Sequence, residues 1–216
     1  MNFKQAHVSN FTTGRTQSIM YIVIHYTAND GDTAKNNVDY YARESLKASA
    51  HYFVDEKEVW QSVKESDTAY HCGANSYKHK ECRNSNSIGI ELCSRQYEDG
   101  TYYIKPETVA NGIKLTKELM AKYNIPEENV IRHYDVTGKI CPAPMVKDEK
   151  QWESFKKELR TIQELVTPND IVWELGHRGF VTDTKGMLDE MNQNPDGRLY
   201  WLARKMLNYI RRNEVV

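Results

Sequence analysis

The sequence predicts an α/β domain with a mixed central β-sheet flanked by helices, followed by a small all-α C-terminal module. Over residues 1–166, apolar strand patterns alternate with amphipathic helix patterns, which is typical of a sheet covered by helices. Residues 167–216 carry helical periodicity without strand patterns. Thr167 and Pro168 mark the change, so we predict two domains, residues 1–166 and residues 167–216.

Six segments of the first domain carry strand signals. Residues 18–27 are a β-branched and aromatic run that is too apolar for an exposed strand, so we expect it at the centre of the sheet. Two runs flank the polar DEKE tetrad and predict a β-hairpin, namely residues 49–54 and 58–63. The other expected strands are residues 87–94, 99–104 and 130–134.

Amphipathic periodicity predicts the helices. Residues 33–47 begin with Thr33 as an N-cap, and residues 106–123 carry Pro106 in their first turn. Residues 147–166 repeat apolar side chains on one face. Three short helical patterns follow in the C-terminal module, at residues 168–175, 184–192 and 198–212. On the last of these we expect an inner apolar face made of Leu199, Leu202, Met206 and Ile210.

Composition limits the classes of partner. With a net charge of -1, the chain lacks the basic excess of nucleic-acid-binding proteins, and we expect neither nucleic-acid nor membrane binding. No stretch approaches the ~18 apolar residues of a membrane span. Residues 1–14 lack a signal-peptide core, so we expect synthesis in the cytoplasm without a signal peptide. We expect the four cysteines to be reduced, with Cys72 and Cys82 as the pair to check for a bridge.

The segment RHYDVTGKICP, residues 132–142, has the composition of a metal-binding loop. His133 and Cys141 are eight positions apart with Gly138 between them, and imidazole and thiolate both bind zinc. A catalytic zinc needs a third ligand, which spacing alone leaves open among 7 histidines and 4 cysteines. Glu91 lies within an apolar strand pattern, where a carboxylate must reach a cation or line a wet cleft.

Five motifs in a fixed order carry a resemblance to a known family. They are IVIHYTA, SAHYFVDEKEVWQ, AYHCG, NSIGIE and the RH…KICP segment, within residues 20–155. In this order and at these separations, they resemble zinc-dependent N-acetylmuramoyl-L-alanine amidases, many of them phage endolysins, which share their fold with peptidoglycan recognition proteins. The resemblance implies that fold for the first domain.

The resemblance also implies roles for individual residues. Those matching family site positions are His25, His133 and Cys141 as zinc ligands, Glu91 and Lys139 as catalytic residues, and His71 and Asn86 as lining of the substrate groove. In these roles, Glu91 transfers protons and Lys139 stabilises negative charge on the reacting oxygen. A tyrosine that some phage members use near the zinc would fall at Ala50, so this chain looks like the glutamate-using branch.

The implied function is hydrolysis of the amide between N-acetylmuramic acid and L-alanine by zinc-activated water. We expect a phage or prophage endolysin that lyses Gram-positive walls and reaches the wall after release from the cell. The alternatives are a non-catalytic peptidoglycan-binding protein and a cytosolic amidase that recycles muropeptides. For the C-terminal module we expect cell-wall binding, with homodimerisation through its apolar helices as the rival.

Overall fold

A computed structural model describes residues 2–160, 168–194, 197, 200, 202–203, 205–207 and 210. The chain divides into two compact units, Met1–Leu159 and Arg160–Val216. The domain boundary predicted at residues 166 and 167 lies outside the described residues. Among the described residues, no helix combines the length and the apolar character needed to cross a bilayer.

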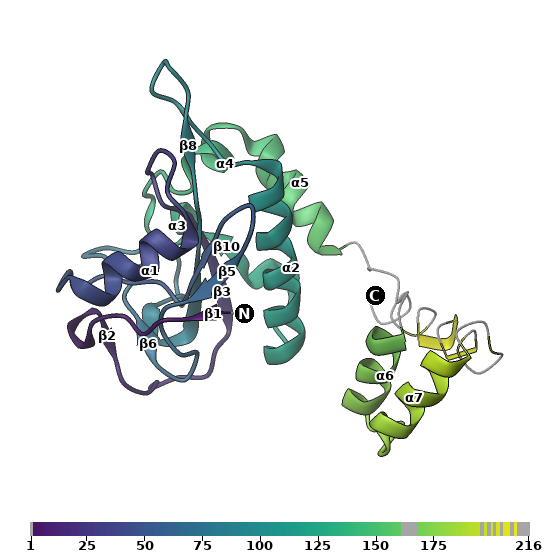
Figure 1. Cartoon of the computed structure of the whole chain (residues 1–216). Coiled ribbons are helices and arrows are strands. Elements are labelled where there is room, and N and C mark those ends of the chain that lie inside the picture. The colour runs from purple at the N-terminus through teal and green to yellow at the C-terminus, as the bar shows by residue number, and fades with distance from the viewer. Residues whose placement is uncertain are drawn as a thin grey trace. The chain divides into compact units, whose positions relative to one another are not determined.

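The larger unit is built on a mixed sheet (Figure 1). The sheet has six strands in the order β1-β5-β4-β7-β3-β10. The strands are β1 (Asn2–Phe3), β3 (Tyr21–Tyr26), β4 (Tyr52–Val54), β5 (Val59–Gln61), β7 (Ser87–Leu92) and β10 (Val130–Arg132). Only β4 and β5 pair antiparallel, as the predicted hairpin, and the other neighbours pair parallel. The fold class predicted for this unit is thereby confirmed.

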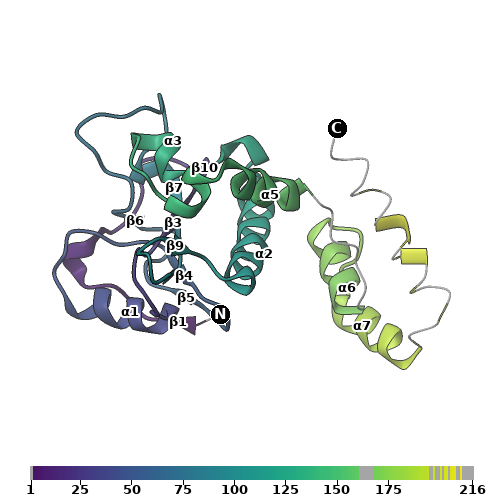
Figure 2. The ribbon, with the colours of Figure 1, turned by 90° about the horizontal axis from the view of Figure 1, so that it is seen from above.

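Helices cover both faces of this sheet (Figure 2). On one face, α2 (Pro106–Tyr123) and α5 (Glu149–Arg160) pack on a core that includes Ile22, Ile24 and Ile90. On the other face, α1 (Ala34–Arg43) packs against Phe53. Strands that are covered on both sides need apolar residues at every position, which explains the continuous apolar run of β3.

Helix α1 ends at Arg43, earlier than the predicted residue 47. The buried side chain of Asn10 forms hydrogen bonds with the backbone at the end of α1 and just after it. The Asn10 amide nitrogen donates to the carbonyl oxygens of Tyr41 and Glu44, and its Oδ1 accepts from the backbone of Leu46 and Lys47. These bonds replace the next helical turn. A side chain from so far along the chain leaves no signal in the local periodicity.

The strand predicted at residues 130–134 is also shorter than expected, because a helix begins inside it. Strand β10 ends at Arg132, and α3 (His133–Thr137) follows directly. The Asp135 carboxylate accepts from the Arg132 backbone N–H at 2.9 Å and so caps the helix start. A second short helix, α4 (Ala143–Lys147), follows the loop that contains Cys141.

Four minor strands form two antiparallel pairs beside the main sheet. They are β2 (Phe11–Thr12) with β6 (Thr68–Ala69), and β8 (Arg95–Gln96) with β9 (Tyr102–Tyr103). The strand predicted at residues 99–104 is therefore reduced to β9. Three 3-10 turns, η1 (Val8–Asn10), η2 (Asn84–Asn86) and η3 (Glu127–Asn129), complete the unit.

The smaller unit contains α6 (Pro168–His177), α7 (Thr184–Gln193) and helical backbone at the described residues from 200 to 210. Its core includes Ile171, Leu175 and Met191. In the last segment Ala203 and Leu207 are buried in this core, whereas Leu202 and Met206 are about half exposed. The inner face predicted there is therefore wrong for Leu202 and Met206, because packing against α6 and α7 selects the neighbouring stripe.

Candidate active site

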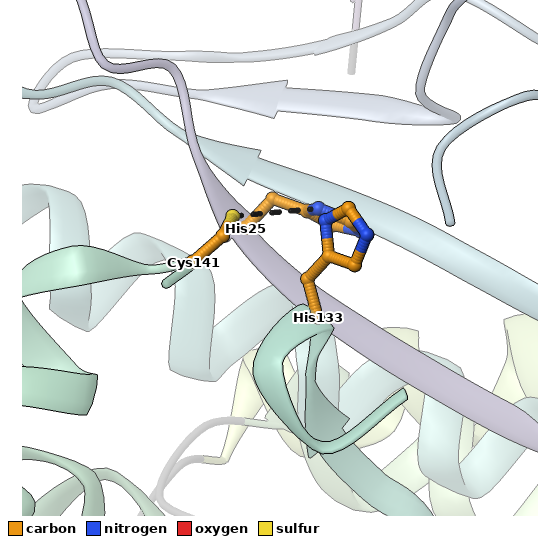
Figure 3. Close-up of side chains that lie close together, drawn as sticks. All are labelled: His25, His133 and Cys141. Carbon is orange, nitrogen blue, oxygen red and sulfur yellow. Dashed lines mark hydrogen bonds between the residues drawn. The ribbon is translucent and has the colours of Figure 1, made fainter. Parts of the chain in front are cut away.

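The three predicted metal ligands lie together at the carboxyl end of the central strands (Figure 3). His25 stands near the end of β3, and His133 begins α3 directly after β10, which pairs parallel with β3. The loop after α3 turns at Gly138, which has φ +86°, and the Tyr134 N–H donates to the Cys141 carbonyl oxygen. This turn returns Cys141 to the two histidines, so that the ligand atoms lie within 4.8 Å of one another.

The geometry fits a tetrahedral zinc ion. Zinc holds nitrogen at about 2.0–2.1 Å and sulfur at about 2.3 Å, which separates neighbouring N and S ligands by about 3.6 Å. The distance from His25 Nδ1 to Cys141 Sγ is 3.7 Å. His133 Nδ1 is buried and finds no hydrogen-bond partner among the described residues. Buried polar atoms normally have partners, so this nitrogen is placed as a ligand would be.

Burial also sets the protonation of these ligands. It lowers the pKa of His25 well below the ordinary value and that of His133 to about 4, with Lys139 adding to the effect on both. Both imidazoles are therefore neutral at pH 7, which is the form that binds a metal. Burial raises the pKa of the Cys141 thiol to about 12, so this thiol keeps its proton until a cation replaces it.

Glu91 lies beside the ligands because β7 pairs with β3 in a register that sets Glu91 opposite His25. Its Oε1 is 3.9 Å from His25 Nδ1, and its Oε2 is buried without a hydrogen-bond partner among the described residues. Burial raises the pKa of Glu91 to about 8, and the Lys139 ammonium opposes this rise. The side chain as a whole keeps 18% of its surface exposed, although Oε2 itself is buried.

A cavity of about 610 Å³ opens next to the candidate metal centre. It is lined by three predicted site residues, His71, His133 and Lys139. Lys47, Tyr70 and Asn84 also line it, and sequence reasoning missed them; a turn-rich loop next to a candidate histidine is the signal that could have marked Tyr70.

Asn86, which was predicted to line the groove, lies within the 3-10 turn η2 and is 3% exposed. Its amide oxygen accepts from the Arg83 backbone N–H, and its amide nitrogen donates to the Glu81 carbonyl oxygen. These bonds hold the turn that carries Asn84. A direct role of Asn86 in substrate binding stays a prediction.

The two residues before β4 have structural roles. Ala50, where some relatives carry a tyrosine, is buried against Phe53 and α1. His51 is fully buried, and its Nδ1 accepts from the Gly89 backbone N–H at 3.0 Å. Neither side chain lines the cavity.

A larger cavity of about 780 Å³ lies at the other end of β3, next to Ser18 and Ile19. Its acidic side chain, Glu65, already accepts hydrogen bonds from Tyr52, Lys122 and Tyr123. The predicted catalytic and metal-binding residues are not part of its lining. Chemistry therefore favours the smaller cavity as the active site, despite its smaller volume.

Comparisons with known proteins identify a family for residues 15–144. The family model for N-acetylmuramoyl-L-alanine amidase matches residues 15–144, which contain every predicted site residue. The chain is 39% identical to the amidase CwlL of Bacillus licheniformis over 150 residues, which cover 65% of this chain and 41% of CwlL. It is 32% identical to the amidase XlyA of Bacillus subtilis over 150 residues, which cover 68% of this chain and 46% of XlyA. The chain thus spans less than half the length of these two relatives.

Solved structures agree as well. PlyL is 29% identical with a TM-score of 0.60, covering 74% of this chain and 96% of PlyL. The catalytic domain of XlyA is 30% identical with a TM-score of 0.58, covering 74% of this chain and 99% of that domain. A mutant endolysin from Bacillus subtilis is 31% identical with a TM-score of 0.57, covering 73% of this chain and 97% of the endolysin. The family model, these structures and the clustered candidate ligands together show that the chain belongs to the N-acetylmuramoyl-L-alanine amidase family.

Proposed function

We propose that this protein is a zinc-dependent amidase that hydrolyses the bond between the lactyl group of N-acetylmuramic acid and L-alanine in peptidoglycan. The observation that carries the proposal is the cluster of His25, His133 and Cys141 with Glu91 directly beside it. Two imidazoles and one thiolate leave the fourth position of a tetrahedral zinc open, as a catalytic site requires. The family and its relatives' names supply the substrate class.

The chain's own residues account for proton transfer and for stabilisation of the developing negative charge. A zinc ion at this site would supply a Lewis acid that acidifies water towards a pKa of about 7. Glu91 would accept the proton of the attacking water and pass it to the departing amine. A cation beside Glu91 favours its charged form, which counters the effect of burial on its pKa. The Lys139 ammonium, which lines the cavity, would stabilise the negative charge that develops on the amide oxygen.

A non-catalytic peptidoglycan-binding protein is the first alternative. Such relatives typically lack the cysteine ligand, whereas this chain keeps Cys141 together with Glu91 and Lys139. A cytosolic amidase that recycles muropeptides is the second alternative. The additional helical unit after residue 159 argues against it, since an enzyme acting on small fragments has little use for a wall anchor.

We further propose that the protein acts as an endolysin on Gram-positive walls after release from the cytoplasm, and that the smaller unit binds the wall. Trp173 is 60% exposed and its ring stacks on His177 with centroids 5.0 Å apart. Exposed flat rings suit contact with the apolar faces of sugars. The exposed Leu202 and Met206 support the rival, a homodimer formed through this unit.

Sedimentation of the full chain with walls separates these two roles. The Trp173→Ala variant should sediment less with Gram-positive walls while its mass in analytical ultracentrifugation stays unchanged. Loss of a dimer without loss of wall binding would contradict wall binding through this face.

Hydrolysis is tested with purified full-length protein and Gram-positive cell walls. We expect new alanine amino termini to appear, to disappear with a chelator and to return with added zinc. Cys141→Ser should abolish zinc-restored activity. Cys93→Ser is the control and should retain this activity, because Cys93 is buried in the apolar cluster with Val38 and Phe53. Release of reducing sugar, or activity that ignores zinc removal, would overturn the proposal.

A further inference from the structure

His71 is held rigidly beside the candidate metal centre by its backbone. It follows β6 in a loop, and the side chain of Asn84 fixes that loop. Asn84 Oδ1 accepts from the backbone N–H of His71 at 3.1 Å and from that of Cys72 at 2.8 Å. The imidazole of His71 is therefore presented from a fixed main chain.

The His71 ring joins two groups, His25 on one side and Ser87 on the other. His71 Nδ1 lies 3.1 Å from His25 Nε2, and His71 Nε2 lies 3.1 Å from Ser87 Oγ. Ser87 Oγ in turn lies 2.6 Å from the carbonyl oxygen of Arg83. These contacts form a continuous chain of hydrogen bonds, which we call the Ser87–His71–His25 relay.

With one proton on each imidazole, counting protons along the relay determines which nitrogens carry hydrogen. A carbonyl oxygen only accepts, so the Ser87 hydroxyl gives its one proton to Arg83. Ser87 Oγ must then accept from His71 Nε2–H. A neutral imidazole protonated on Nε2 has its lone pair on Nδ1, so His71 Nδ1 accepts from His25 Nε2–H.

The relay leaves the lone pair of His25 on Nδ1. That nitrogen is the one that faces the other site groups, at 3.7 Å from Cys141 Sγ and 3.9 Å from Glu91 Oε1. The opposite tautomer of His25 would carry its proton on Nδ1, the nitrogen that must bind the metal. A partner that selects the tautomer of a ligating histidine also orients its ring.

Gly89 makes room for this arrangement. A Cβ atom on Gly89 would lie 2.5 Å from His71 Cγ and 2.9 Å from His71 Nδ1, closer than real Cβ contacts allow. Gly89 stands two residues before Glu91 on β7 and pairs with Val23, two residues before His25 on β3. The same pair of strands thus positions the carboxylate, the ligand and the surface on which the His71 ring lies.

We infer that His71 is a positioning residue for the metal centre, which holds His25 in the tautomer and orientation that offer Nδ1 to zinc. The inference rests on the zinc site of the proposed function. His71 also lines the cavity, where it is predicted to contact substrate. Measuring zinc affinity without substrate separates the two roles. Outer partners of ligating histidines typically contribute roughly 10- to 100-fold to metal affinity.

The test measures the zinc dissociation constant of the full-length chain by competition with a chromophoric chelator, without substrate. His71→Leu removes the acceptor, and we expect zinc binding to weaken by roughly 10- to 100-fold. His71→Asn places an amide oxygen where Nδ1 stands and should recover most of the affinity. Ser87→Ala removes the acceptor of the relay proton and should weaken zinc binding measurably.

Ser85→Ala is the matched control, because Ser85 lies in η2, two residues before Ser87, and its hydroxyl donates to Gln17 on the surface. It should leave zinc affinity unchanged. Unchanged zinc affinity in His71→Leu with only a raised KM would overturn the inference and make His71 a substrate-binding residue. If His71→Leu fails to fold, equal zinc affinity in Ser87→Ala, His71→Asn and the control would likewise overturn it. Absence of tight zinc binding by the unsubstituted chain would overturn the proposed function as well.

Discussion

Glu91 should destabilise the metal-free fold whenever it is ionised, and Glu91→Gln should remove that cost at almost constant volume. Burial raises its pKa from 4.5 to about 8. A change of one in pKa corresponds to about 1.4 kcal/mol, so the upper limit of the cost is about 5 kcal/mol. Because the side chain keeps 18% exposure, water offsets part of this. We expect about 2–3 kcal/mol in the free energy of unfolding.

The dependence on pH gives this prediction its sign. Below pH 4.5 the carboxyl group is protonated in both states, so Glu91 and a glutamine should be equivalent. Between pH 4.5 and about 8 the folded state binds more protons than the unfolded state, so stability falls as pH rises. The advantage of Glu91→Gln should therefore grow across this interval and level off above it.

Urea titrations of the full chain in the presence of a chelator, at about pH 5 and about pH 8.5, measure the effect on the larger unit. Glu153→Gln on the exposed face of α5 is the matched control and should show no such pH dependence. Added zinc should cancel the advantage of Glu91→Gln, since a nearby cation favours the carboxylate. A difference between wild type and Glu91→Gln that is the same at both pH values would refute the reasoning.

Three further predictions concern the segment of residues 132–142. Zinc binding at pH 7 should release about one proton from Cys141, whose pKa is raised to about 12, and calorimetry in two buffers of different ionisation enthalpy measures it. Lys139→Ala should lower kcat by about 100-fold while zinc affinity stays within a factor of about two, and an equal loss of both would contradict its role. Arg132→Ala should destabilise the larger unit by about 3 kcal/mol in urea, because Arg132 is 7% exposed and binds Asp135 and Glu149.

The centre of the fold follows from the sequence because burial on both sides of a strand leaves a continuous apolar run. Residues 18–27 carry such a run, and the strand that they form, β3, lies between β7 and β10 in the sheet. Element ends were less predictable, since single side chains decide them. Asn10 ends α1 from more than thirty residues away, and Asp135 ends β10 by capping α3.

The candidate metal ligands were predictable only as an ordered set of motifs. Spacing pointed to His133 and Cys141, but a histidine near the end of a buried strand is more often an ordinary core residue. The register that sets His25 beside Glu91 depends on which strands become neighbours, and one sequence does not state this. The resemblance supplied that information by matching the positions together.

The Ser87–His71–His25 relay lies beyond sequence reasoning for a different reason: its members come from a loop and two strands, 16 and 46 residues apart. A signal was nevertheless present. A glycine in the middle of a buried strand weakens the strand unless another group must approach its backbone closely. Gly89 stands in such a strand, and the group that approaches it is the His71 ring. Gly89→Ala should therefore displace His71 and weaken zinc binding without changing any polar atom of the site, which links the choice of glycine at this position to the metal chemistry.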